Sequence, residues 1–99
     1  MTDPVITYTE TGGKGRYLAR VDGIDAEAEL TLSKMSDRAI IVDHTGVPDA
    51  LRGQGIGAAL ARRVIEDARA AGQRIVPLCP FFKAYAHRHR EELADVIQW

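Results

Sequence analysis

Apolar and polar positions alternate along the first half of the chain with a period of two residues. The clearest stretch is "AEAELTLSKM", where alanine and leucine point one way and mostly polar residues the other, as in an antiparallel strand with one solvated face. A second stretch, "RAIIVDHTGV", has a nearly unbroken apolar centre, which is typical of a central strand buried on both faces. The pattern predicts four antiparallel strands joined by short turns, over residues 5–10, 16–23, 26–35 and 38–47.

The period changes to that of a helix after three closely spaced glycines. Ile56, Leu60 and Val64 recur at helical spacing and form one apolar stripe. Gly72 follows the last apolar position of the stripe and is a natural residue to end a helix. The pattern therefore predicts one long amphipathic helix between the glycines and Gly72.

Residues 73–79 have the pattern of a fifth strand. Because the helix before it is long enough to form a crossover, we expect this strand to run parallel to residues 38–47. Pro80 can open a last helix over residues 80–96, with a break near Arg90. Four antiparallel strands, a helix, a strand and a helix make the predicted fold class α+β, with one β-α-β unit near the end.

Composition narrows the class of protein. The chain has 99 residues, 45% of them hydrophobic, which suits a single domain over residues 1–99. Lys and Arg total 13 against 14 Asp and Glu, and this balance gives no support for binding to nucleic acid or to a membrane surface. No apolar run approaches the roughly 20 residues of a membrane helix, and residues 1–10 are too polar for a signal peptide. With one cysteine, we expect a small cytoplasmic protein, either a monomer or a weak dimer.

Three glycines at alternate positions precede the predicted long helix, in "RGQGIGAAL", residues 52–60. A Walker loop would need Gly-Lys-Ser/Thr there, and a dinucleotide fingerprint would need a glycine where Leu60 stands, so both motifs are excluded. Glycines at the start of a helix let several unpaired backbone N–H groups converge on one anion, and Arg52 can add a charged donor. The alternative is that the glycines only shape a tight turn. Their number and their flanking polar residues favour a seat for a pyrophosphate.

The motif resembles the coenzyme A pyrophosphate loop of the GNAT superfamily of N-acetyltransferases, whose pattern is Gln/Arg-x-x-Gly-x-Gly/Ala. Arg52, Gly55 and Gly57 occupy its three defined positions. Together with the later "LCPF", the segment 38–90 is similar to a subfamily of small GNAT-like proteins. The resemblance implies a compact GNAT-like fold, with a mostly antiparallel sheet and a splayed parallel strand pair around a central helix. It also implies acetyl-CoA as co-substrate and an amine as acetyl acceptor, with a protein or peptide amine as one possibility.

The resemblance further implies how the co-substrate binds. Backbone groups of the splayed strand would pair with the pantetheine amides, the glycine turn would hold the pyrophosphate, and a tyrosine of the last helix would lie close by. In chain order these residues are Thr45, Gly46, Val47, Arg52, Gly53, Gln54, Gly55, Ile56, Gly57, Ala58 and Tyr85. The chain departs from the subfamily at Gly46, where an acidic residue is common. It also lacks the helices that most of the superfamily carries between the first two strands, which predicts an open acceptor site or no efficient activity.

Two side chains are candidates for the chemistry of acetyl transfer. Cys79 could protonate the leaving thiolate or form an acetyl-cysteine, or it could be an inert buried residue. His44 is the candidate base, with Asp43 and Thr45 on the opposite face of its strand; the alternative is a histidine without a chemical role. We expect His44 and Cys79 to face one another across the pantetheine cleft. Tyr85 is either a secondary proton donor or a packing residue.

The segment "HRHR", residues 87–90, holds the remaining candidates. No metal ion is expected there, because His87 and His89 diverge by roughly 200° on a helix. Arg88 or Arg90 could contact the 3′-phosphate of coenzyme A, although a solvated basic helix face is the plainer interpretation. Two other function classes stay open: a non-catalytic acyl-CoA-binding module, and a small interaction protein in which the glycines form only a turn.

Overall fold

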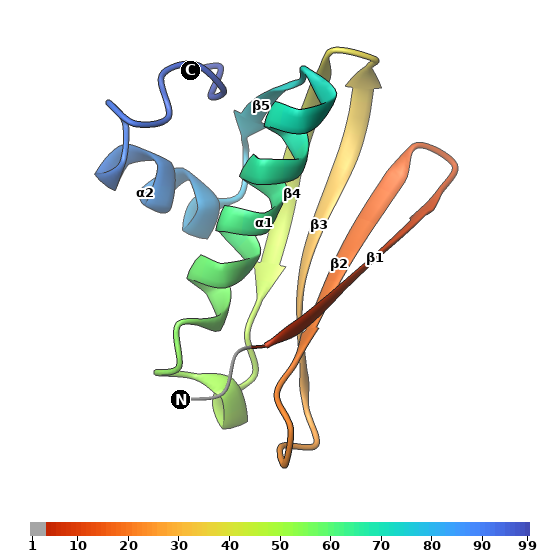
Figure 1. Ribbon diagram of the computed structural model, residues 1–99, viewed down its shortest axis with the longest axis vertical. Coiled ribbons are helices and arrows are strands. Elements are labelled where there is room, and N and C mark those ends of the chain that lie inside the picture. The colour runs from red at the N-terminus through yellow and green to blue at the C-terminus, as the bar shows by residue number, and fades with distance from the viewer. Residues whose placement is uncertain (1–3) are drawn as a thin grey trace.

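A five-stranded mixed sheet carries two helices on one face (Figure 1). The structure is a computed structural model and describes residues 4–99; residues 1–3, which open the segment compared above with a signal peptide, lie outside the described part. The strands are β1 (Val5–Thr11), β2 (Lys14–Arg20), β3 (Glu27–Ser36), β4 (Ala39–Gly46) and β5 (Arg74–Pro77). The helices are α1 (Ile56–Ala71), α2 (Pro80–Arg88) and a short 3-10 helix, η1 (Asp49–Leu51).

The strands lie side by side in the order in which the chain forms them, β1-β2-β3-β4-β5. Neighbours from β1 to β4 pair antiparallel, whereas β5 pairs parallel with β4 and α1 makes the crossover between these two strands. Both helices contact the sheet and each other (Figure 1). The predicted α+β class, with its single parallel strand pair, is confirmed.

Most of the apolar core lies between this face of the sheet and α1. In β3, Ala28, Leu30 and Leu32 are at most 3% exposed and alternate with partly exposed polar residues. The opposing stripe of α1 consists of Ile56, Gly57, Leu60, Ala61, Val64, Ile65 and Ala68. Full burial of one large apolar side chain contributes about 1.5–3 kcal/mol, so the match between these two surfaces accounts for much of the stability of the fold.

Tyr17 joins the β1–β2 hairpin to α1. Its hydroxyl donates a 2.6 Å hydrogen bond to Asp67 Oδ2, and Arg63 forms an ion pair with the same carboxylate at 3.2 Å. The ring of Tyr8 lies so close to Gly15 that a Cβ atom there would come within 2.4 Å of the Tyr8 hydroxyl. Burial and the hydrogen bond to Asp67 raise the pKa of Tyr17 above its ordinary value of 10.

The end of the sheet differs from the sequence prediction. β5 ends at Pro77 rather than at Cys79, because the Leu78 N–H bonds back to the Val76 carbonyl at 3.1 Å and turns the chain out of the sheet. α2 ends at Arg88, close to the break predicted near Arg90, and turns rather than a second helical piece follow it. The turns that follow bring three apolar side chains into the core: Leu93, Val96 and Ile97.

The C-terminal residues lie along the outer edge of β5. Ile97 forms an isolated parallel bridge with Ile75, whose N–H and C=O bond to Val96 and Gln98 at 2.8 Å each. Arg69 of α1 holds the carboxylate of Asp95 at 2.8 Å. These contacts explain why the last helix stops early: a straight helix to residue 96 could not return to β5.

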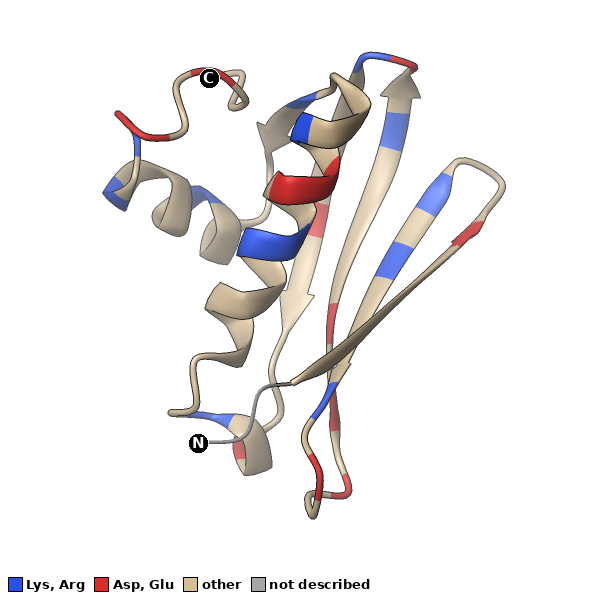
Figure 2. Ribbon diagram, in the orientation of Figure 1, with Lys and Arg blue, Asp and Glu red and all other residues tan. Residues whose placement is uncertain are grey.

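Charged residues are spread over most elements of the molecule. Figure 2 shows basic and acidic residues interspersed on the strands, with none that is acidic along the first half of α1. Within residues 4–99, no helix has the length and apolar character needed to cross a membrane. The same part of the chain contains no group of three or more His, Cys, Asp or Glu placed to hold a metal ion.

Tyr17→Phe tests the link between the hairpin and α1. At pH 7 we expect a loss of about 1 kcal/mol in the free energy of unfolding, because the hydroxyl bond to Asp67 is removed while the ring stays. Since the folded pKa of Tyr17 is raised, the stabilisation is full below pH 10 and is lost as the pH rises above it, where the unfolded tyrosine ionises. Urea denaturation at several pH values should show the gap between the two proteins narrowing above pH 10; a constant gap would contradict this.

Candidate functional site: a pocket at the start of α1

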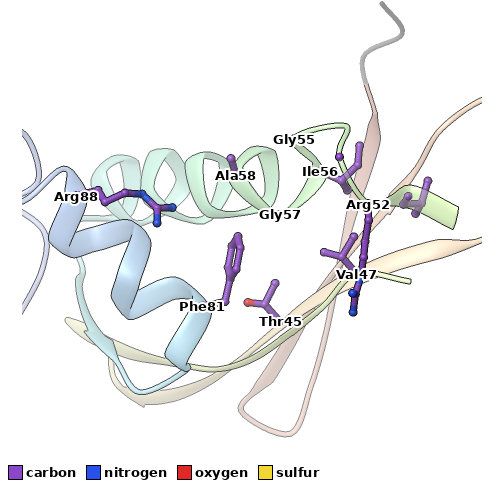
Figure 3. A pocket seen from close by; sticks show the side chains of 11 residues that line it. Thr45, Val47, Arg52, Gly55, Ile56, Gly57, Ala58, Phe81 and Arg88 are labelled. Carbon is purple, nitrogen blue, oxygen red and sulfur yellow. The ribbon is translucent and has the colours of Figure 1, made fainter. Parts of the chain in front are cut away.

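A pocket of about 510 Å³ opens between the end of β4, the glycine turn, the first turn of α1 and one side of α2 (Figure 3). Most of the residues expected to bind the co-substrate line it: Thr45, Val47, Arg52, Gly53, Gly55, Ile56, Gly57 and Ala58. Leu51, Phe81 and Arg88 complete its wall. The pocket therefore combines segments that are far apart in the sequence.

The pocket exists because β4 and β5 separate. Their parallel pairing ends at Val42 and Pro77. The Leu78 N–H turns back to Val76, and Cys79 then sends its N–H to the Val42 carbonyl at 2.9 Å. β4 continues to Gly46 paired with β3 alone, so its other edge borders the pocket at Thr45. The two strands thus diverge as the splayed pair expected from the sequence.

The glycine turn leaves the start of α1 open to an anion. Gly53 and Gly55 adopt φ values of +80° and +71°, which other residues rarely adopt. Gly55 is the N-cap residue and provides no capping side chain, and the first helical hydrogen bond runs from the Ala59 N–H to the Gly55 carbonyl at 3.0 Å. The amides of the first turn therefore have no helical acceptor, and no acidic side chain lies in that turn. These amide donors suit a diphosphate. Arg52 also lines the pocket, where its exposed guanidinium forms an ion pair with Asp49 at 3.1 Å.

Gly57 has a different role from the two glycines before it. Its φ is not positive, but a Cβ atom there would lie 2.6 Å from Cζ of Phe81. The missing side chain thus allows the ring of Phe81, from α2, to rest on the first turn of α1. Gly53 and Gly55 thus provide the tight turn, whereas Gly57 allows the close approach of two helices, a role that was not predicted from the sequence.

Cys79 and Thr45 meet where the strands part. Cys79 is the N-cap residue of α2 and is 2% exposed, and its Sγ–H donates to Thr45 Oγ1 at 3.4 Å. Thr45 lines the pocket, whereas Cys79 lies behind it. The pairing of these two side chains was not predicted from the sequence.

The structure corrects the expectation that His44 faces Cys79. A β-bulge in β4 pairs Val42 with Leu32 and His44 with Thr31, which leaves Asp43 as the extra residue. The bulge shifts the alternation by one position, so Thr45 points toward the helices and the exposed His44 points to the opposite face.

Asp43 was expected on the opposite face from His44, and this too is corrected. Its carboxylate accepts a 2.6 Å hydrogen bond from Ser33, which alternates with the buried Leu32 and so lies on the outer face of the sheet. Thr45 alone among the three residues faces the pocket. A histidine and a carboxylate thus share the face away from the helices.

Comparisons with known proteins agree with the geometry. The family model described as GCN5-related N-acetyl-transferase matches residues 16–96. The chain belongs to this family. The solution NMR structure of a GCN5-like protein from Staphylococcus aureus, described as belonging to the N-acetyltransferase class, superimposes with a TM-score of 0.68 at 32% sequence identity, covering 93% of this chain and 87% of that one. No curated protein matches the chain.

Enzymes of this family take acetyl groups from acetyl-CoA, and free amides such as those at the start of α1 suit a diphosphate. Three of the residues expected to bind it do not line the pocket: Gly46, Gln54 and Tyr85. Tyr85 is 8% exposed and its ring packs 4.5 Å from that of His89, which supports its packing role. Phe81, which was not among the residues expected to bind the co-substrate, is the aromatic side chain in the pocket.

The basic segment at the end of α2 divides into two parts. Arg88 lines the pocket and extends along α1 (Figure 3). Arg90 instead lies over the ring of Trp99, 5.6 Å from its centroid, and His87 stacks on the same ring. Of the two arginines considered for the 3′-phosphate, only Arg88 has the position for it.

Substituting alanine at either end of α1 tests the left-handed turns. Gly55 and Gly72 cap the same helix with φ and ψ of 71° and 19° and of 69° and 31°. Gly55→Ala and Gly72→Ala should each lower the free energy of unfolding by about 1–2 kcal/mol, since a Cβ atom is strained in this conformation. Urea denaturation measures both; an unchanged Gly55→Ala protein would show that the turn does not need positive φ.

Proposed function

We propose that this chain binds acetyl-CoA in the pocket at the start of α1 and transfers the acetyl group to a primary amine of a protein or peptide. One observation carries the proposal. The pocket is lined by the free amides of the first turn of α1, by Arg52 and Arg88 at its opposite ends (Figure 3), and by Thr45, whose hydroxyl accepts a hydrogen bond from the buried thiol of Cys79.

Different residues along the pocket bind different parts of the coenzyme. Amides from Gly53 to Ala58 hold the diphosphate, and Arg88 pairs with the 3′-phosphate. The unpaired edge of β4, from Thr45 to Val47, hydrogen-bonds the pantetheine amides in the manner of an added strand. This orientation brings the thioester toward Cys79.

The chemical step needs a proton donor for the thiolate and a base for the amine. Cys79 supplies the proton through its Sγ–H, and Thr45 orients that thiol through their shared hydrogen bond. His44 lies on the opposite face of the sheet, out of reach of this pair, so the amine enters uncharged and releases its surplus proton to water. In this direct transfer both substrates are bound together; an acetyl-cysteine on Cys79 is the second route.

The acceptor side of the site is open. Between β1 and β2 the chain makes only a tight turn at Gly12 and Gly13, so no helix is inserted there. The acceptor side therefore has no helical wall there, which suits an amine on a large molecule. We place the protein in the cytoplasm, as a monomer or weak dimer.

A non-catalytic acyl-CoA-binding module is the second candidate. The burial of Cys79, at 2% exposed, and the absence of a side chain at Gly46 favour it. Both candidates need the same pocket, so coenzyme binding tests them together and turnover tells them apart.

Calorimetry with coenzyme A tests the pocket. The wild-type protein should bind, and ligand at 100 times its Kd should stabilise the fold by about 2.7 kcal/mol. Gly55→Ala should weaken binding of coenzyme A at least tenfold, while Gly72→Ala, equally strained but at the far end of α1, should not.

The arginines that line the pocket can be tested in the same way. Arg52→Ala and Arg88→Ala should each raise the Kd for coenzyme A about tenfold, whereas the control Arg62→Ala, at an exposed position, should leave it unchanged. No heat and no thermal shift at millimolar coenzyme A would end both candidates.

Cys79→Ala tests the chemistry. With acetyl-CoA and a lysine-bearing peptide, we expect turnover to fall at least a hundredfold while the affinity for acetyl-CoA stays within about threefold, since the thiol acts on the leaving group. Mass spectrometry of the peptide measures the product. Unchanged turnover would remove the cysteine from the mechanism, and no product from the wild-type protein would favour the binding module.

A further inference from the structure

The reactive end of the proposed site is closed in this structure. Cys79 is 2% exposed and does not line the pocket, whereas its hydrogen-bond partner Thr45 does. A thioester seated in the pocket would therefore have to displace a side chain before it could reach the Cys79 thiol. The positions of the pocket residues indicate which side chain that is.

The ring of Phe81 stands in the way. In Figure 3 it projects from α2 into the space between Gly57 of α1 and Thr45 of β4. Its Cζ, Cε2 and Cε1 atoms would be 2.6, 3.0 and 3.2 Å from a Cβ atom on Gly57, so the ring rests directly on the first turn of α1. Phe81 and Thr45 thus line the same pocket, with the ring between Thr45 and the first turn of α1, and the thiol of Cys79 lies behind Thr45.

The side chain of Phe81 can also move more freely than that of Phe82, the next residue in the chain. It is 39% exposed and lies at the second residue of α2, while Phe82 is fully buried in the core. Turning the Phe81 ring toward solvent would empty the space beside Thr45 without opening the core. Exposed aromatic side chains change rotamer on fast time scales, so such a movement needs no rearrangement of the fold.

We propose that Phe81 is a gate residue, which admits the pantetheine arm and thioester to the Cys79 thiol behind Thr45 only when its ring leaves Gly57. The ring thereby discriminates between ligands: a nucleotide that fills only the phosphate-binding turn leaves the gate closed, and a full coenzyme must open it. This inference rests on the proposed function for the identity of the ligand. The closure itself is a property of the protein alone.

The first test needs no coenzyme. Cys79 is the only cysteine, so its reaction with the aromatic disulfide DTNB, followed by absorbance, reports access to this thiol. Phe81→Ala should accelerate the reaction at least tenfold. Gly57→Ala should do so too, because the added methyl group displaces the ring, although it suits a helix better than glycine does.

Leu78→Ala is the matched control. Leu78 directly precedes Cys79 in the sequence, is 65% exposed and does not line the pocket, so its truncation should leave the thiol rate unchanged. Thermal melts must show all three variants folded at the assay temperature. A folded Phe81→Ala protein that reacts at the wild-type rate, or a Leu78→Ala protein that reacts as fast as it, would overturn the gate.

The second test compares coenzyme A with ADP, which lacks the pantetheine arm. Phe81→Ala should bind coenzyme A about tenfold more tightly than the wild-type protein does and bind ADP equally well, because only the longer ligand displaces the ring. Equal changes for both ligands, or weaker binding of coenzyme A, would make the ring an ordinary wall of the pocket and refute the gate. If neither ligand binds while the thiol rates change as expected, the gate stands and the proposed function fails.

Discussion

The hydrogen bond from the Cys79 N–H to the Val42 carbonyl is the interaction on which the arrangement of the site depends. It lies where the parallel ladder stops, and the chain around it has few donors left, because Pro77 and Pro80 have no N–H group. The reverse turn at Leu78 then carries β5 away from β4. The free edge of β4 and the placement of α2 over the start of α1 follow from this separation.

The two ends of α1 divide the tasks of stability and binding. At its C-terminal end, Gly72 donates its N–H to carbonyls of the last turn, and Arg69 lies nearby as a favourable positive charge. At its N-terminal end no side chain satisfies the free amides, and no acidic residue balances the helix dipole. In folded proteins such N–H groups usually have a hydrogen-bond acceptor. Here they face a pocket, where a bound anion would supply the acceptor.

The parts of the fold that depend on local sequence could be predicted well. The alternation of β3, the apolar stripe of α1 and the role of Gly72 all follow from neighbouring residues and match the structure. The glycine turn could also be predicted, because the positive φ of Gly53 and Gly55 is a requirement of the local backbone. The alternation of β4 failed at Asp43, where the bulge depends on pairing with β3 and leaves no mark in the sequence of β4 itself. The contact of Phe81 with Gly57 joins two helices and could not be seen from either motif alone.

The bridge between Ile75 and Ile97 has a further consequence for the sheet as a whole. By occupying the outer edge of β5, the C-terminal residues leave β1 as the side on which a further strand could add within the described chain. A truncation before Val96 would uncover a second hydrogen-bonding edge and the apolar side chain of Ile75, close to the place where β5 leaves β4. The C-terminal residues thus protect the edge of β5 from pairing with a strand of another molecule. A tag attached at Trp99 should be joined by a linker that leaves these residues on β5.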